Sequence, residues 1–269
     1  MIVGFYILCF LLLGLLQVGA ELLVGPRIAD ERESLFQWLS LISVGFATWV
    51  ILRKVDKLPW STVGLGRAAA NPPAIVTGAL LGAFTIGLAS LGLYVAHLMR
   101  FDPAKAGSWL GEAGHAVVVL LPAAFFEELF IRGYVFAVIR RAAGWRLALI
   151  STSVVFGLLH AWNPGADAES ILAVTVAGFF LGLILLATQS LYAAGAAHFA
   201  WNWVMAGVLH IAVSGVPSVD VDYRMVETGP DWLTGGPWGP EGGLAAVALM
   251  FVGIFYLYGR YVRGMEWKA

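Results

Sequence analysis

The chain has 269 residues, of which 60% are hydrophobic and 12% are charged, and its mean hydropathy is +0.83. Soluble domains contain roughly 45–50% apolar residues, so this composition indicates a polytopic membrane protein. The formal net charge of -1 excludes a basic nucleic-acid-binding surface. Because Cys9 is the single cysteine, an intramolecular disulfide framework and a cysteine-rich zinc site are also excluded.

Eight apolar stretches are predicted to form helices that cross a hydrocarbon core about 30 Å thick. In chain order they are residues 2–24, 35–52, 74–99, 115–139, 147–161, 169–187, 190–211 and 243–259. The sequence therefore predicts an all-α membrane bundle of about eight transmembrane helices, with residues 1–269 in one integral-membrane domain. The first stretch has no Lys or Arg before Arg27 and is expected to span the membrane rather than act as a cleaved signal peptide. The fifth stretch is short, so a tilted or re-entrant helix is expected there.

The distribution of Lys and Arg predicts that both termini are cytoplasmic, because short cytoplasmic loops are enriched in these residues. With that orientation, the inner segments contain Arg53, Lys54, Lys57, Arg67, Arg140, Arg141, Arg146, Arg260, Arg263 and Lys268. The outer segments contain Arg27, Arg32, Arg100, Lys105 and Arg224.

Three ionisable residues, Glu127, Glu128 and Arg132, interrupt the fourth apolar stretch. A charge near the bilayer centre costs at least about 2.5–3.5 kcal/mol on insertion scales, which makes each of them a candidate functional residue. Glu128 and Arg132 are four residues apart and are expected to form a salt bridge on one helix face. Glu127 points about 100° away around the helix, so it has no evident local partner.

Two later stretches contain further polar residues at the same spacing. In the first, His160 follows Phe156 by four residues, and in the second, Asn202 follows His198 by four residues. An unpaired carboxylate in a poorly solvated place can act as a general base. We therefore expect Glu127, assisted by His160, to deprotonate a water molecule that attacks a carbonyl group. His198 and Asn202 would donate hydrogen bonds to the developing oxyanion.

These three motifs resemble those of the CAAX prenyl endopeptidase and bacteriocin-processing (CPBP) family, which comprises the type II CAAX proteases and their bacterial relatives. The resemblance covers chiefly residues 115–211, the predicted catalytic core, and implies an intramembrane endopeptidase. It implies the same roles for Glu127, His160, His198 and Asn202, with Glu128, Arg132 and Phe156 as supporting residues. Eukaryotic members remove the last three residues of prenylated CAAX proteins. This small chain is similar to prokaryotic members, so a prokaryotic cell membrane is expected and CAAX specificity is not carried over.

Several alternatives remain open at this point. Glu127, His160 and His198 are a possible zinc-binding set, but the HExxH string is absent, and we expect no cofactor. A proton- or ion-coupled transporter would predict internal repeats, and none is evident. A non-catalytic scaffold or immunity protein of the same fold is the third possibility. The expected partners are the lipid bilayer and a membrane-associated peptide or protein.

Overall fold

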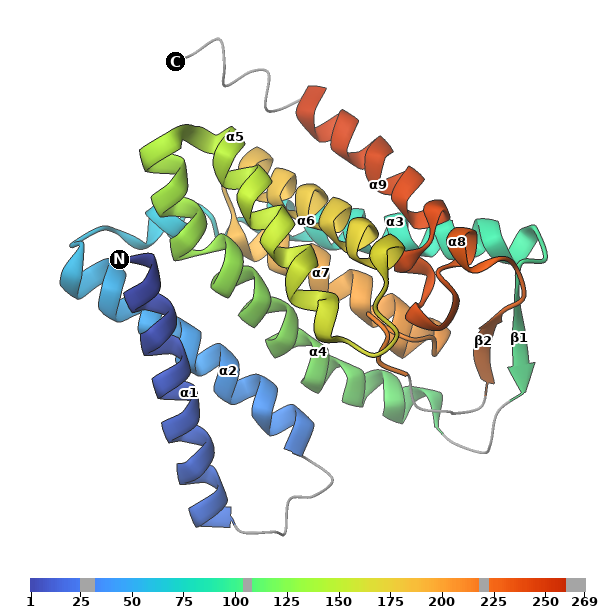
Figure 1. The fold of residues 1–269 in the computed structure, drawn as a ribbon, viewed down its shortest axis with the longest axis horizontal. Coiled ribbons are helices and arrows are strands. Elements are labelled where there is room, and N and C mark those ends of the chain that lie inside the picture. Colours follow the sequence, from blue (N-terminus) through green and yellow to red (C-terminus); the bar gives the residue numbers. More distant parts are fainter. Residues whose placement is uncertain (25–31, 104–107, 218–222, 260–269) are drawn as a thin grey trace.

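The computed structural model describes residues 1–24, 32–103, 108–217 and 223–259. It is mainly helical, which confirms the all-α prediction and supports a multi-pass membrane protein (Figure 1). Of the predicted outer cations, Arg27 and Lys105 lie outside the described residues, as do Arg260, Arg263 and Lys268 of the inner set.

Each predicted apolar stretch overlaps one or two helices, although the bounds differ (Figure 1). The long helices are α1 (Ile2–Val24), α2 (Arg32–Trp49), α3 (Pro72–Val95), α4 (Trp109–Arg132), α5 (Tyr134–Leu159), α6 (Ala168–Thr188), α7 (Leu191–Trp203) and α9 (Leu244–Leu257). Turns of π-helix extend α2 over Val50–Val55 and α7 over Val204–Leu209. The short elements are β1 (Met99–Pro103), β2 (Tyr223–Glu227) and α8 (Asp231–Thr234).

Within the described ranges, five helical segments are long and apolar enough to cross a membrane. They are Ile2–Leu22, Glu33–Val55, Pro72–Val95, Trp109–Trp162 and Ala168–Thr188. The segment Trp109–Trp162 contains both α4 and α5, and α9 is a shorter apolar helix. The number of transmembrane helices, about eight, therefore stays a prediction.

The predicted fourth stretch, 115–139, is not one helix. It is divided at Gly133, whose ψ of -109° is not helical, so α4 ends at Arg132 and α5 begins at Tyr134. A second kink lies at Gly144, where φ is +85° and ψ is 166°. The predicted fifth stretch, 147–161, is thus the second half of a bent helix, and this half packs along α6 (Figure 1).

Small residues hold α7 inside the bundle. A Cβ atom added to Gly78 or Gly82 of α3 would lie 2.2 Å or 2.0 Å from the carbonyl oxygen of Ala193 or Ala197 in α7. Since such contacts exclude any side chain, the glycines allow the two helices to approach closely. On another side of α7, Gly195 faces Phe125 of α4. The helix that carries His198 is therefore fixed between α3 and α4.

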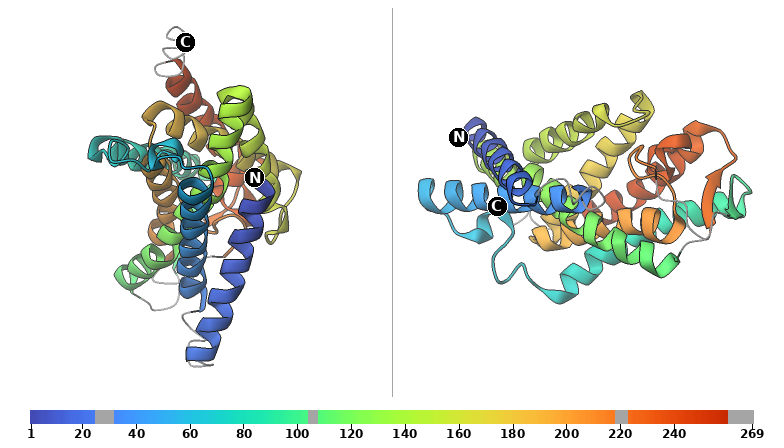
Figure 2. Two further views of the ribbon diagram at one scale, coloured as in Figure 1. Left: turned by 90° about the vertical axis from the view of Figure 1, so that its left-hand side faces the viewer. Right: turned by 90° about the horizontal axis from the view of Figure 1, so that it is seen from below.

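The peripheral elements lie at the edges of this core. Figure 2 shows α1 beside α2 at one edge of the bundle, consistent with the contacts between these helices. β1 and β2 form an antiparallel pair in which Met99 is opposite Glu227. The Gly- and Pro-rich segment 229–243 folds into α8 and two short 3-10 turns. Trp238 and Glu241 are buried in it, and its last 3-10 turn packs against α6 and α9.

Candidate active site

The predicted salt bridge between Glu128 and Arg132 is present. Arg132 Nη1 donates a hydrogen bond to Glu128 Oε1 over 2.6 Å, and both side chains are fully buried. Arg132 Nη2 also donates to the carbonyl oxygen of Gly178 in α6, at 3.1 Å. The arginine therefore neutralises a buried carboxylate and joins the end of α4 to α6.

His198 of α7 lies between the two glutamates. Its Nδ1 atom is 3.0 Å from Glu128 Oε1, and its Nε2 atom is 3.9 Å from Glu127 Oε2. When Nδ1–H donates to Glu128, Nε2 is the nitrogen that remains on the Glu127 side. Glu128 consequently has a second partner besides Arg132, which the sequence-based interpretation did not include.

Phe156 packs among the polar residues of the cluster. Its ring lies 4.5 Å from the guanidinium carbon of Arg132, and its centroid lies 5.8 Å from that of His198 in an edge-on arrangement. The His160 ring is 4.8 Å away, and its Nδ1 atom is 2.8 Å from the Phe156 carbonyl oxygen. With Nδ1–H donating to that carbonyl group, His160 keeps Nε2 as a hydrogen-bond acceptor.

One cavity of about 330 Å³ is lined by all four candidate catalytic side chains: Glu127, His160, His198 and Asn202. No hydrogen bond or ion pair joins Glu127 to His160 among the described residues, and the nearest basic atom to Glu127 is His198 Nε2. Asn202 is 9% exposed, and its carboxamide has no hydrogen-bond partner within the described part of the chain. The cavity therefore contains a buried amide and a carboxylate with unused hydrogen-bonding capacity.

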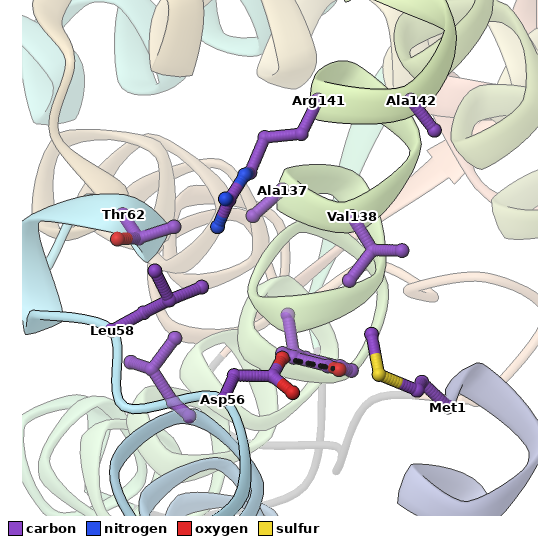
Figure 3. A pocket seen from close by; sticks show the side chains of 10 residues that line it. Met1, Asp56, Leu58, Thr62, Ala137, Val138, Arg141 and Ala142 are labelled. Carbon is purple, nitrogen blue, oxygen red and sulfur yellow. Dashed lines mark hydrogen bonds between the residues drawn. The ribbon is translucent and has the colours of Figure 1, made fainter.

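A larger cavity, of about 480 Å³, lies where α2 ends and α5 begins. Tyr134 donates a hydrogen bond to Asp56 there, at 2.8 Å, and Arg141 points into the space toward Thr62 and Leu58 (Figure 3). None of the candidate catalytic residues lines it. Although it is larger, its lining lacks the carboxylate and histidine combination that general acid and base chemistry uses, so the smaller cavity is the candidate active site.

The structure adds Glu241, which the sequence analysis did not single out. Its side chain is buried and accepts hydrogen bonds from Trp201 Nε1 at 2.8 Å and from Ser214 N and Oγ at 2.6 and 2.7 Å. Trp201 lies between His198 and Asn202 in the sequence of α7, and the Ser214 carbonyl oxygen accepts a hydrogen bond from Asn163. Glu241 thus links the helix that carries His198 to the turn that follows His160.

The sequence contains little signal for this contact. Glu241 stands in Pro240-Glu241-Gly242-Gly243, a composition typical of an exposed loop, just before the last apolar stretch. The acid lies 40 residues from Trp201 in the chain, so no local spacing pairs them.

We expect Glu241→Ala to lower both the melting temperature and the catalytic rate. Removing the carboxylate leaves the Trp201 indole N–H and the Ser214 N–H without acceptors, and each unsatisfied buried group costs about 1–3 kcal/mol. Rates and melting temperatures of wild type, Glu241→Ala and Glu241→Gln in lipid nanodiscs check this expectation. Glu241→Gln keeps one carbonyl oxygen and is expected to retain more activity than Glu241→Ala. Wild-type behaviour of Glu241→Ala would contradict a positioning role.

The possible zinc set does not come together as a group of metal ligands. Among the described residues, no group of three or more His, Cys, Asp or Glu side chains is placed to hold a metal ion. Glu127, His160 and His198 share a cavity but do not form such a group in this arrangement.

Fold and site together define a multi-pass helical membrane protein with carboxylates and histidines gathered around a cavity inside the bundle. Residues 109–204 match the family described as type II CAAX prenyl endopeptidase Rce1-like. This match confirms the family resemblance predicted from the motifs. It spans α4 to α7 and includes all seven residues predicted to be catalytic or supporting.

The family implies an intramembrane endopeptidase of the CAAX protease type, and it does not favour a transporter or a scaffold. It also implies a peptide or protein substrate. No curated protein and no solved structure matches the chain.

Proposed function

We propose that this protein is an endopeptidase that hydrolyses a peptide bond of a membrane-associated protein or peptide, using a water molecule activated by Glu127. The observation that carries the proposal is the single cavity lined by Glu127, His160, His198 and Asn202 within the segment that matches the family. The carboxylate and both imidazoles are groups that move protons near neutral pH, as hydrolysis requires.

In the proposed mechanism Glu127 accepts a proton from water. The Glu127 side chain is 34% exposed and lines the cavity, so its carboxylate is available to a water molecule. The available Nε2 of His160 would help to orient that water. Once the water attacks the scissile carbonyl carbon, Glu127 would return the proton to the leaving amine, as general bases do in the second half of such reactions.

The oxyanion would be stabilised by His198 and Asn202. Glu128 holds His198 through Nδ1, and a carboxylate in that position stabilises the imidazolium form. Protonated Nε2 of His198 and the Asn202 amide would then donate hydrogen bonds to the oxyanion. Loss of one such donor typically costs about 10²–10³ in rate. Arg132 and Phe156 would hold Glu128 and His198 in position.

We further propose that no metal ion takes part. The mechanism gives each histidine a role that needs no metal ion: His198 is held by Glu128, and His160 is held by the Phe156 carbonyl group. Catalysis by Glu127 needs no metal to generate the nucleophile, because a nearby carboxylate can deprotonate water during the attack.

Comparison of peptide termini in membranes tests the proposed function. Wild type and Glu127→Ala are produced at equal levels in the same host, and new peptide termini are identified by mass spectrometry with and without a chelator. We expect termini that appear with wild type only and that persist in the chelator. Identical termini for the two proteins would contradict the protease function, and loss of the termini in the chelator would indicate a metal-dependent mechanism.

The protein is proposed to lie in a prokaryotic cell membrane with both termini in the cytoplasm. The basic residues concentrated where α2 ends and along α5 support this orientation. In a Cys9→Ser background, a membrane-impermeant maleimide applied to intact cells is expected to label Glu169→Cys but not Arg67→Cys. The reverse pattern would contradict the orientation.

A further inference from the structure

The cavity proposed as the active site is lined by three carboxylates and four histidines, His115, His160, His198 and His210. Besides Glu127, it is lined by Glu33 in the first turn of α2 and by Glu112 in the first turn of α4. Among the described residues, none of those that line the cavity is a Lys or Arg. A helix N-terminus favours a carboxylate in its first turn, which explains why both glutamates are tolerated there. The helix N-terminus is fixed, so it does not place a positive charge in the space between Glu33 and Glu112.

The end of the bundle where α2 and α4 begin is acidic as well. The described residues of the segments that join the helices there are 21–24, 32–34, 99–103, 108–112, 160–170, 210–217 and 223–243. Nine of them are Asp or Glu and three are Lys or Arg. A surface of one sign around a cleft with low-dielectric walls concentrates the field inside the cleft. A cation that approaches this end is therefore drawn toward the cavity, and an anion is repelled.

Two polar side chains in the lining, Asn202 and Glu127, have hydrogen-bonding atoms that a ligand in the same cavity could use. Asn202 is 9% exposed and its carboxamide has no partner within the described residues, and Glu127 Oε2 is likewise buried without a hydrogen bond. Unpaired buried polar groups are costly unless a ligand or water satisfies them. The amide can bond a peptide group, and the carboxylates favour a cationic side chain next to it.

We propose that the cavity selects substrates that carry Lys or Arg close to the scissile bond. The proposal rests on the proposed function, because it specifies the substrate class of that same site. A cationic side chain would lie between Glu33 and Glu112 while the adjacent peptide bond reaches Glu127. The same carboxylates disfavour a free C-terminal carboxylate within a few ångströms, since like charges repel strongly in a poorly solvated cavity. An internal bond in a basic segment fits this lining better than the last bonds of a chain.

Peptide binding tests this inference separately from catalysis. The protein in nanodiscs of neutral lipid is titrated with fluorescein-labelled tetralysine and tetraglutamate peptides that are otherwise identical and amidated at the C-terminus. The cavity variant is Glu33→Gln with Glu112→Gln. Its matched control is Glu21→Gln with Glu169→Gln, which removes the same charge from exposed positions at the same end. Melting temperatures verify that both variants are folded.

We expect wild type to bind tetralysine at least about tenfold more tightly than tetraglutamate, with an affinity that falls as salt rises. The cavity variant is expected to lose about tenfold in affinity for tetralysine, and the control variant no more than about twofold. Equal losses in the two variants, or equal binding of the two peptides, would overturn the inference. Because binding needs no hydrolysis, unchanged peptide termini in the membrane experiment would reject the protease function without affecting this result.

Discussion

Glu127→Gln is expected to lower the rate of peptide hydrolysis by about 10²–10⁴-fold, the usual contribution of a general base, while the protein keeps its fold. Glutamine has the shape of glutamate but its amide does not accept a proton from water near neutral pH. The Glu127 side chain is 34% exposed, and among the described residues its Oε2 atom makes no hydrogen bond and only a 3.9 Å contact with His198 Nε2, so its replacement removes no short structural contact at that atom. Initial rates of purified protein in nanodiscs, on a substrate identified from the membrane experiment, measure the effect.

The matched control for this prediction is Glu169→Gln. Glu169 is an exposed glutamate in the first turn of α6 and does not line the cavity. We expect its hydrolysis rate to equal that of wild type within about twofold. A similar loss of rate in both variants would mean that the overall charge of the acidic end, rather than the Glu127 carboxylate, governs the rate.

Glu128→Ala is expected to have the largest effect on stability. Glu128 and Arg132 are fully buried, and removal of one partner of a buried ion pair costs about 3–5 kcal/mol because the other charge is left uncompensated. His198 also loses the acceptor for its Nδ1–H. We therefore expect a lower yield in the membrane, a lower melting temperature and a loss of activity.

A double variant separates stability from catalysis. In Glu128→Leu with Arg132→Leu both charges are removed together, and apolar replacement of a buried ion pair is often neutral or stabilising. We expect the double variant to melt closer to wild type than Glu128→Ala does, yet to remain inactive because His198 has lost Glu128. An active double variant would contradict the role of Glu128 in holding His198. A normal melting temperature for Glu128→Ala would contradict the importance of the buried pair.

The parts of the site that follow from local spacing could be predicted from the sequence. The salt bridge between Glu128 and Arg132 depends on a separation of four residues within one helix. The apolar stretches likewise predicted helices, because backbone groups in a bilayer must be satisfied within the segment. Both are properties of a few neighbouring residues.

Contacts between distant segments could not be predicted in the same way. His198 reaches Glu128 across 70 residues of sequence, and Glu241 reaches Trp201 across 40. Glu127 is predicted to act with His160, and the two share a cavity, but the basic atom nearest to Glu127 among the described residues is His198 Nε2. Helical spacing predicts which residues share one face of a helix. Which other helix packs against that face depends on packing over the whole bundle.

Helix ends and close contacts between helices could not be predicted from neighbouring residues either. Hydropathy stays high through Gly133, so it could not reveal that the backbone leaves the helix there. The small residues of α3 and α7 have a spacing typical of helix contacts, but this spacing does not identify Ala193 and Ala197 as the partners of Gly78 and Gly82. Such partners are decided by which backbones approach within van der Waals distance.

The central claim is that Glu127 activates the water that cleaves a peptide bond. Its most direct test is a single-turnover reaction in H₂¹⁸O with purified wild type and Glu127→Gln at equal concentrations, with products analysed by mass spectrometry. We predict that wild type forms a new C-terminal carboxylate containing one ¹⁸O atom, and that Glu127→Gln forms this product at least about 10²-fold more slowly. Cleavage by Glu127→Gln at the wild-type rate would contradict the claim.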